Sequence, residues 1–278
     1  MCGCAGQLSF GSFLLRVVAI IAIHNERPYL ANCLTHLVQN GVEYAIIDNS
    51  STDGAENILS EPRFAAGLVA VQHLPFTGVF DLNAQLVAKQ RMAATLDADW
   101  FIHLDADEIM HSYQEQESLK SAIVRLDAQG WQVINFDEFV FLPVDANYVT
   151  DCEGMQPILH YYFFEPKRPR LMRAWKATNN LSNVGSGGHI LTGADFRLAP
   201  EPLTLRHYIF RDQEHAFEKY RRRQYSQAEI ARGWHFNRVG QPETRFTFPS
   251  PTALERITTR GERNLRRDNP RLEHYWQW

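Results

Sequence analysis

The strongest constraint on the fold is an alternation of short apolar segments with amphipathic segments that continues as far as Leu142. The first segment, Arg16–Ile23, is apolar without a break after Arg16, as in a parallel strand that is covered on both faces. Leu30, Leu34 and Leu37 then have the spacing of an amphipathic helix. Further strands are predicted at residues 44–47, 68–74, 100–104 and 132–142, and further helices at 83–96 and 116–129. This order is typical of an α/β three-layer sandwich with a mostly parallel central sheet.

The chain is less regular beyond Leu142. Residues 145–166 are aromatic-rich without a clear period, a strand is predicted at 170–175, and 179–193 has the composition of a loop. Helices are predicted at 213–232 and near 253–267. Because neither a repeat nor a low-complexity linker interrupts the chain, we expect one domain over residues 1–278 with an irregular C-terminal elaboration.

Composition excludes several classes of protein. A formal net charge of −4 and a pI near 6.3 do not fit a general nucleic-acid-binding protein, which usually carries a basic domain. The four cysteines contain no CxxC pair and are too few for a disulfide framework, so a reducing cytoplasm is the expected compartment. The longest apolar run, Phe13–Ile23, contains Arg16 and is shorter than the roughly 20 residues of a membrane-spanning helix. We therefore expect a cytoplasmic protein without a transmembrane segment or a signal peptide.

Polar clusters stand directly after three predicted strands. They are His24-Asn25-Glu26, Asp48-Asn49 and Asp105-Ala106-Asp107-Glu108. The carboxyl ends of the strands form the ligand crevice in open α/β sheets, so neighbouring strands would bring these clusters into one cleft. His24, Asn25 and Glu26 are therefore candidates for substrate binding, although Asn25 or Glu26 could instead cap the following helix.

Asp105-Ala-Asp107 is the sharpest chemical signal. Two carboxylates two residues apart, just past a buried strand, can both point at one divalent cation. Mg²⁺ and Mn²⁺ prefer oxygen ligands and take the remaining ones from water and substrate phosphates. Such an ion would offset the charge that grows on a departing diphosphate. A solvated acidic turn would have the same sequence, so the metal site gains its support from the other strand ends.

These motifs together resemble family 2 glycosyltransferases of the GT-A fold. The resemblance covers residues 16–140 and rests on His24-Asn-Glu-Arg27, on Ile46-Ile-Asp48-Asn-Ser-Ser-Thr-Asp53-Gly54 and on Trp100-Phe-Ile-His-Leu-Asp105-Ala-Asp-Glu108. It implies a nucleotide-binding half, 1–142, and an acceptor-binding half, 143–278. It further implies direct, inverting displacement of a diphosphate from a nucleoside-diphosphate sugar, with UDP the expected nucleotide.

The resemblance also assigns roles to single residues. It implies that Asp48 holds the nucleotide base, that Asp105 and Asp107 contact the ribose and a metal-bound diphosphate, and that Arg91 lies near the nucleotide. Typical members have two acids after the second strand, whereas this chain has Asp48-Asn49, which leaves the identity of the base open. From the residues alone, Asp48 could cap a helix and Arg91 could pair with a nearby acid.

An inverting transfer needs a general base that takes the proton of the acceptor hydroxyl. Family members often use an acid of a Glu-Asp pair in the later half, and this chain has no clean copy of it. The candidates are the paired carboxylates Asp137 and Glu138, and His189, because an imidazole titrates near neutral pH. His189 could equally be a loop histidine without a role.

Three further candidates lie late in the chain. His207 is a candidate third metal ligand, since GT-A enzymes sometimes add a C-terminal histidine, or it is a histidine satisfied within the core. Lys219 and Arg222 belong to a run of cations that could bind the diphosphate or an anionic acceptor. A solvated helix face is the alternative for this run.

The sequence thus predicts a hexosyltransferase that uses Mn²⁺ or Mg²⁺, a nucleotide-sugar donor, and a glycan, lipid-linked or protein acceptor. A lipid-linked acceptor would be met by peripheral contact with a membrane surface. The motifs of ATPases, dehydrogenases, zinc proteases and α/β-hydrolases are missing from the sequence. A metal-dependent nucleotidyltransferase and a catalytically silent nucleotide- or carbohydrate-binding protein remain as alternatives.

Overall fold

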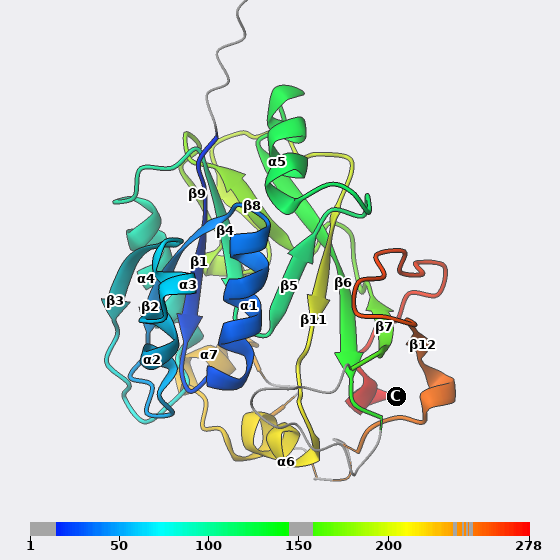
Figure 1. Cartoon of the computed structure of the whole chain (residues 1–278). Coiled ribbons are helices and arrows are strands. Elements are labelled where there is room, and N and C mark those ends of the chain that lie inside the picture. Colours follow the sequence, from blue (N-terminus) through cyan, green and yellow to red (C-terminus); the bar gives the residue numbers. More distant parts are fainter. Residues whose placement is uncertain (1–14, 145–157, 236–237, 241, 243, 245–246) are drawn as a thin grey trace, which may run out of the picture.

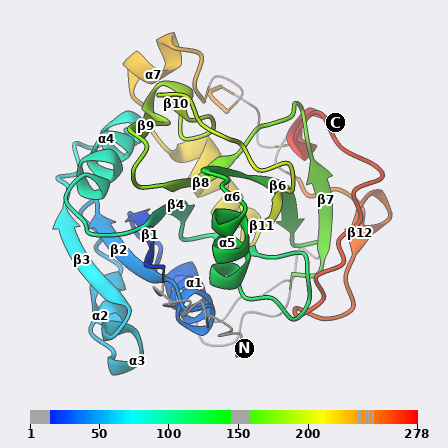
Figure 2. The ribbon, with the colours of Figure 1, turned by 90° about the horizontal axis from the view of Figure 1, so that it is seen from above.

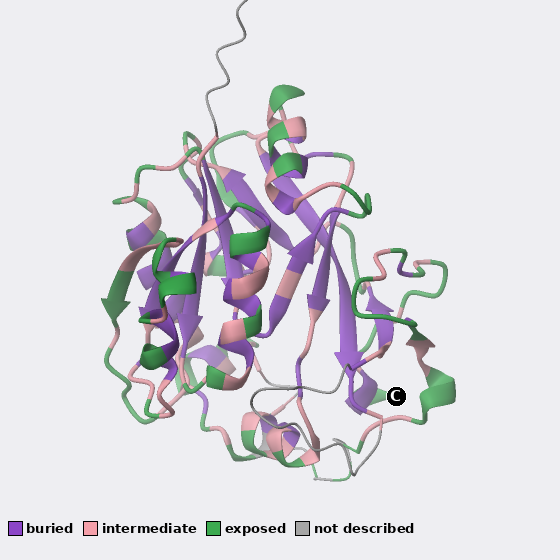
Figure 3. Cartoon of the chain, viewed as in Figure 1, coloured by how far each residue is buried: buried purple, intermediate pink, exposed green. Residues whose placement is uncertain are grey.

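The computed structural model describes residues 15–144, 158–235, 238–240, 242, 244 and 247–278. Within them a large curled sheet runs through the molecule, with helices on both faces of its N-terminal part (Figure 1, Figure 2). Buried residues concentrate in the strands, whereas the helices present their exposed residues outward (Figure 3). The predicted α/β class is confirmed.

The N-terminal strands form the parallel part of the sheet, as predicted. They are β1 (Val17–Ile23), β2 (Glu43–Asp48), β3 (Leu68–His73) and β4 (Trp100–Asp105), in the spatial order β3-β2-β1-β4. Ile23 pairs with Asp48, and Ala22 pairs with Asp105. The polar clusters that follow these strands therefore lie at one edge of the sheet.

Helices cover β1 from both sides, which explains its uninterrupted apolar run. Val17 and Ile21 pack in one core with α1 (Arg27–Gln39) and α5 (Leu119–Ala128). Val18 and Ile20 point the other way, because side chains alternate along a strand, and pack with α4 (Leu82–Ala93). Two short helices, α2 (Ala55–Leu59) and α3 (Pro62–Ala65), connect β2 to β3.

The later strands make the sheet mixed. β8 (Met172–Lys176) pairs antiparallel with β4 and with β6 (Val133–Leu142). β7 (His160–Phe164) and β12 (Glu255–Arg256) extend the β6 side, again antiparallel. β11 (Leu203–His207) runs parallel to β6 and antiparallel to β5 (Glu108–His111), so that His207 pairs with Glu108. The end of β11 therefore lies beside the Asp105-Ala-Asp107 turn.

The helix predicted at 213–232 is broken into pieces. The segment contains α6 (Gln213–Ala216), a π-helical stretch (Phe217–Arg222) and α7 (Gln227–Ala231). Arg223 is extended, and Tyr225 leaves the helical path to form a β-bridge with Phe80. Pairing with a distant loop therefore overrides the helical preference of this segment.

Other predictions for the C-terminal half were wrong as well. No helix forms near 253–267 in the described chain; it has a 3₁₀ turn (Pro251–Ala253) and β12. The aromatic segment 145–166 contains β7, whereas residues 145–157 lie outside the described residues. The predicted loop at 179–193 is mainly confirmed; it holds the two-residue strands β9 (Leu181–Ser182) and β10 (Thr192–Gly193) and a 3₁₀ turn (Val184–Ser186).

Asn25 does not cap α1. Glu26 occupies the N-cap position without a side-chain cap bond, and Asn25 has a φ of 59°. The Asn25 Oδ1 instead accepts a hydrogen bond of 2.7 Å from the Thr52 backbone N–H, which ties the first strand-end cluster to the loop after β2. Across the described ranges, no helix combines the length and apolarity needed to cross a bilayer.

Candidate active site

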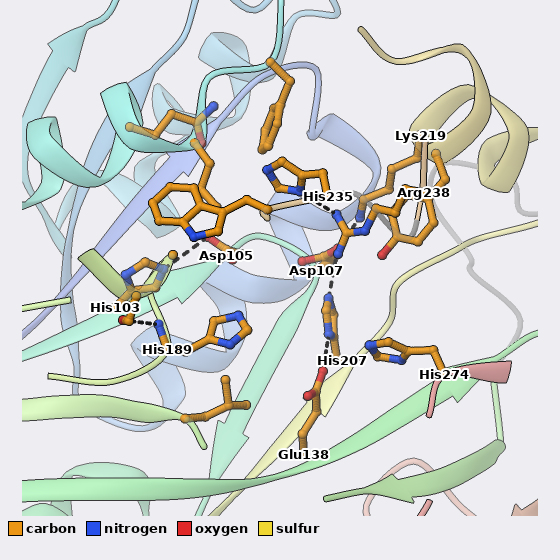
Figure 4. Close-up of a pocket in the computed structure, with 18 of the residues that line it drawn as sticks. His103, Asp105, Asp107, Glu138, His189, His207, Lys219, His235, Arg238 and His274 are labelled. Atoms are coloured by element: carbon orange, nitrogen blue, oxygen red, sulfur yellow. Dashed lines mark hydrogen bonds and ion pairs between the residues drawn. The ribbon is translucent and has the colours of Figure 1, made fainter. Parts of the chain in front are cut away.

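A cavity of about 560 Å³ opens at the carboxyl ends of β1 and β4 (Figure 4). Its lining acids and imidazoles come from both halves of the chain: His24, Glu26, His103, Asp105, Asp107, Glu138, His189, His207, His235 and His274. Its lining cations all come from the second half: Lys167, Arg170, Arg173, Lys219, Arg223 and Arg238. Groups of opposite charge from distant segments therefore face the same space.

The structure brings together most of the candidates named from the sequence. His24, Glu26, Asp105, Asp107, Glu138, His189, His207 and Lys219 all line this cavity. Asn25, Asp48, Arg91, Asp137 and Arg222 are not among its lining residues.

The residues outside the cavity have other partners or face solvent. Asp48 ends β2, and its Oδ1 accepts a hydrogen bond of 2.9 Å from the Ser51 backbone N–H. Asp137 is buried between Arg168, at 3.3 Å, and Arg267, at 2.8 Å. Arg91 is exposed on α4, and Arg222 is an exposed cation that pairs with Glu214 and Glu218.

Asp105 is held by three basic groups. Lys89 Nζ lies 2.9 Å from Asp105 Oδ1, His103 Nε2 lies 3.7 Å from the same oxygen, and Arg173 Nη2 lies 3.9 Å from Oδ2. Burial alone would raise the pKa of Asp105, but these three groups outweigh it and hold the pKa well below its usual range. Asp105 is therefore a carboxylate at neutral pH.

Asp107 carries the second cluster. Lys219 Nζ contacts Asp107 Oδ2, and His207 Nε2 lies 3.5 Å from the same oxygen. The other ring nitrogen of His207 lies 2.6 Å from Glu138 Oε1, so the imidazole bridges two carboxylates (Figure 4). Although burial opposes it, the two carboxylates raise the pKa of His207 to about 10. The imidazole is therefore protonated in the free protein.

A buried ion pair supports the turn between the two aspartates and β5. Arg173 Nη2 donates to Glu108 Oε1 at 2.9 Å, and Glu108 Oε2 accepts from the Asp105 backbone N–H at 3.0 Å. The two side chains are 7% and 1% exposed. Glu108 thus fixes the backbone from which both aspartates project, and Arg173 neutralises it.

The candidate bases differ in their surroundings. Glu138 is paired with Arg170 and His207, and these cations outweigh burial and lower the pKa of Glu138, which makes it a poor proton acceptor. His189 is unprotonated, because burial, followed by the charges of Arg170 and Arg173, lowers its pKa to about 3. Within the described residues we find no hydrogen bond to the His189 ring, whereas its backbone N–H donates to Ser186 Oγ at 3.2 Å.

Aromatic groups lie at both ends of this region. At the ends of β1 and β2, His24 stacks on Phe76 with ring centroids 4.2 Å apart, and its Nδ1 lies 2.6 Å from the Asn49 carbonyl oxygen. On the other side His274 stacks on Phe164 at 3.8 Å. Planar surfaces suited to a base or a sugar ring are therefore available beside the charged centre.

Some side chains in or beside the cavity were not singled out by sequence reasoning. Lys89 had a readable signal: it lies in one helical row with Leu86 and Met92, three residues to either side, and is only 5% exposed. Arg223 belongs to the cation run that the sequence analysis singled out, whereas Arg238 had no signal, because its position depends on how the continuation of the broken helical segment folds back. Arg223 lies over the Phe80 ring at 4.6 Å, and Arg238 lies over the Tyr220 ring at 4.3 Å.

Two of the predicted metal ligands converge. The 3.5 Å between Asp107 Oδ2 and His207 Nε2 is close to the separation of about 3 Å between adjacent ligands of an octahedral ion. No set of three or more His, Cys, Asp or Glu donors is assembled in the described part of the chain. The pair fits an ion of the Mg²⁺ or Mn²⁺ type that takes its other ligands from phosphate and water, once His207 has given up its proton, because only a neutral imidazole binds a metal ion.

Part of the chain matches one known protein family. Residues 18–140 match the family described as "Glycosyl transferase family 2". No curated protein sequence matches the chain.

Solved structures provide further similarities. S. aureus TarS (residues 1–349) in complex with UDP-GlcNAc has a TM-score of 0.45 and 13% identity, covering 84% of this chain and 70% of that one. Mannosyltransferase PcManGT from Pyrobaculum calidifontis, in complex with GDP-Man and Mn²⁺, has a TM-score of 0.42 and 13% identity, covering 81% and 73%. Glucosyl-3-phosphoglycerate synthase from Mycobacterium tuberculosis, with Mn²⁺ and UDP, has a TM-score of 0.30 and 17% identity, covering 45% and 44%.

Proposed function

We propose that the protein is a metal-dependent glycosyltransferase of the GT-A type, and the match of residues 18–140 to glycosyl transferase family 2 is the premise of this proposal. It moves a hexose or related sugar from a nucleoside diphosphate, with UDP first among the candidates, to an acceptor hydroxyl. The observation that carries the proposal is the cavity in which Asp105 and Asp107 face Lys219, Arg223 and Arg238. A metal-bound diphosphate requires such a combination of carboxylates and cations.

Asp107 and His207 are the proposed ligands of Mn²⁺ or Mg²⁺, with Asp105 directed to the ribose or to a ligand water. When bound, the ion supplies positive charge at the diphosphate leaving group. Lys219, Arg223 and Arg238 add charge-assisted hydrogen bonds to the same group. The base of the nucleotide occupies the edge formed by Asp48, His24 and Phe76.

The proposed chemistry is a single displacement with inversion. The oxygen of the acceptor hydroxyl attacks the anomeric carbon, the bond from that carbon to the diphosphate oxygen breaks, and the diphosphate keeps the electron pair. Of the three candidate bases we favour His189, because Asp137 lies outside the cavity and Glu138 is tied to Arg170 and His207. His189 is neutral and lines the cavity, so it can accept the hydroxyl proton, although its pKa of about 3 makes it a weak base in the free protein.

The acceptor is a glycan, a lipid-linked sugar or a protein hydroxyl. Residues 143–278 supply its part of the cavity, through groups such as Phe164, Lys167 and His274. We place the reaction in the cytoplasm, with peripheral contact to a membrane if the acceptor is lipid-linked.

Titration calorimetry with UDP, GDP and CDP tests the proposal. With Mn²⁺ present, the wild-type protein should bind one of these nucleotides, and Asp107→Asn should weaken this binding at least about tenfold, because a metal ligand is lost. Asp97→Asn is the matched control, since that carboxylate is fully exposed and far from the cavity lining. Absence of binding for all three nucleotides, with and without Mn²⁺, would overturn the proposal.

A further inference from the structure

We propose that Lys219 is an internal counter-cation for Asp107, which it releases to a divalent metal ion in order to bind the diphosphate of the donor. In this arrangement Lys219 couples metal binding to nucleotide binding. The inference rests on the proposed function and adds a role that the metal ligands themselves do not have.

The contacts of Lys219 in the free protein support the first state. Its ammonium group contacts Asp107 Oδ2 and donates to the Ile209 carbonyl oxygen at 3.2 Å. The side chains of Lys219 and Asp107 are 11% and 6% exposed. A carboxylate that is buried to this extent is costly without positive partners, and Lys219 supplies one of them, beside the protonated His207, when no metal ion is bound.

The same oxygen belongs to the proposed metal site. His207 Nε2 lies 3.5 Å from Asp107 Oδ2, and a metal ion between these two atoms would meet the ammonium of Lys219 at close range. Two cations beside one carboxylate oxygen repel each other, and the repulsion is strong because Asp107 and Lys219 are both buried. Lys219 therefore has to move when a metal ion binds.

The cavity gives Lys219 a second position. Glu26 lines the same space, its carboxylate has no ion pair among the residues that the structure describes, and Lys219 is the cation that most lowers its pKa. The lysine side chain is long and flexible, and it projects from the π-helical stretch Phe217–Arg222, a backbone form often found at functional sites. Arg223 on the same segment also lines the cavity, so a displaced Lys219 would join a cation that faces the phosphate region.

Calorimetric titration with Mn²⁺ alone, without nucleotide, tests the competition. Lys219→Met removes the competing cation, so it should tighten Mn²⁺ binding by about tenfold, within the range of known coupling effects. The same variant should weaken UDP binding in the presence of Mn²⁺. The factor by which Mn²⁺ strengthens UDP binding should therefore fall in the variant, whereas Lys219→Arg should stay close to the wild type.

Arg223→Gln separates this mechanism from a general effect of cavity charge. It removes one positive charge from the same cavity, but Arg223 has no ion pair with Asp107 in the described structure, so Mn²⁺ binding should tighten by less than about threefold. An unchanged or weaker Mn²⁺ affinity in Lys219→Met, or an equal gain in both variants, would overturn the inference.

Two further controls keep the result decisive. Lys219→Gln carries the same test if thermal unfolding shows that Lys219→Met is not folded. Failure of the proposed function gives a different result: the wild-type protein then binds no nucleotide under any condition. The Mn²⁺ titration without nucleotide still tests the role of Lys219 in that case.

Discussion

Replacing Arg173 by methionine should strongly destabilise the protein, because Arg173 neutralises two acids at the base of the cavity. Arg173 Nη2 lies 2.9 Å from Glu108 and 3.9 Å from Asp105, and the Arg173 and Glu108 side chains are 7% and 1% exposed. Removing one partner of such a buried pair costs about 3–5 kcal/mol, because the other charge stays buried and unpaired. Since domains are stable by only about 5–15 kcal/mol, the variant should lose a large part of its free energy of unfolding.

Urea denaturation followed by tryptophan fluorescence measures this loss. Arg266→Met is the matched control: Arg266 is 60% exposed and pairs with Asp268 at 2.7 Å, so its loss should change the stability little. The double variant Arg173→Met with Glu108→Gln should recover a substantial part of the loss, since the unpaired charge is then removed. If Arg173→Met costs no more than the Arg266 control, or the double variant is no better than the single one, the assignment of this ion pair is refuted.

Three further predictions concern the frame of the cavity. Gly188→Ala should cost roughly 1–3 kcal/mol of stability, because Gly188 has a φ of +85° and a Cβ there would lie 3.0 Å from His103. Gly78→Ala is the control and should cost less, because Gly78 has a similar φ of +87° but open space around it. Equal shifts of the two variants in thermal unfolding would contradict this prediction. Asp81→Ala should lower the free energy of unfolding by about 1 kcal/mol, because Asp81 Oδ1 accepts a hydrogen bond of 2.8 Å from the Ala84 N–H and caps α4. A midpoint of urea denaturation equal to that of the wild type would contradict this prediction. His111 is buried, and its ring accepts a hydrogen bond of 2.9 Å from Arg206 Nε. Burial, followed by the charge of Arg206, lowers the folded-state pKa of His111 well below 6.5. The contribution of His111 to stability is therefore lost as the pH falls below 6.5. Relative to His111→Gln, the wild-type free energy of unfolding should therefore fall as the pH is lowered from about 6.5 to 5, with a slope that approaches about 1.4 kcal/mol per pH unit, whereas parallel curves for the two proteins would exclude this role.

The N-terminal half of the fold could be predicted because its signals are local. The apolar run of β1 indicates a strand that is covered by helices on both faces. Parallel pairing of β1 with β2 and β4 then places Asp105 and the clusters after β1 and β2 at one edge of the sheet. The match of residues 18–140 to a glycosyltransferase family agrees with the resemblance that these motifs indicated. Patterns of this kind require no knowledge of the rest of the chain.

The second half depends on long-range pairing that no local pattern encodes. β5 begins with the charged Glu108, which is stable in a buried strand only because Arg173 arrives from β8. The cations of 219–223 suggested one continuous helix, but pairing of Tyr225 with Phe80 breaks it, and Lys219 contacts Asp107 whereas Arg222 stays exposed. The roles of Arg222 and Lys219 could therefore not be told apart from the sequence, because both belong to the same charged run.

Turnover of a nucleotide-sugar tests the central proposal most directly. The protein would be incubated with Mn²⁺ and with UDP-, GDP- and CDP-sugars, together with simple glycan acceptors, and the phosphorus products would be followed by ³¹P NMR. Glycosyl transfer, or slow transfer to water, breaks the bond at the anomeric carbon and releases the intact nucleoside diphosphate, which is the predicted result; Asp107→Asn should abolish it. Release of a nucleoside monophosphate and a sugar phosphate would instead show cleavage at phosphorus and would contradict the proposed glycosyltransferase.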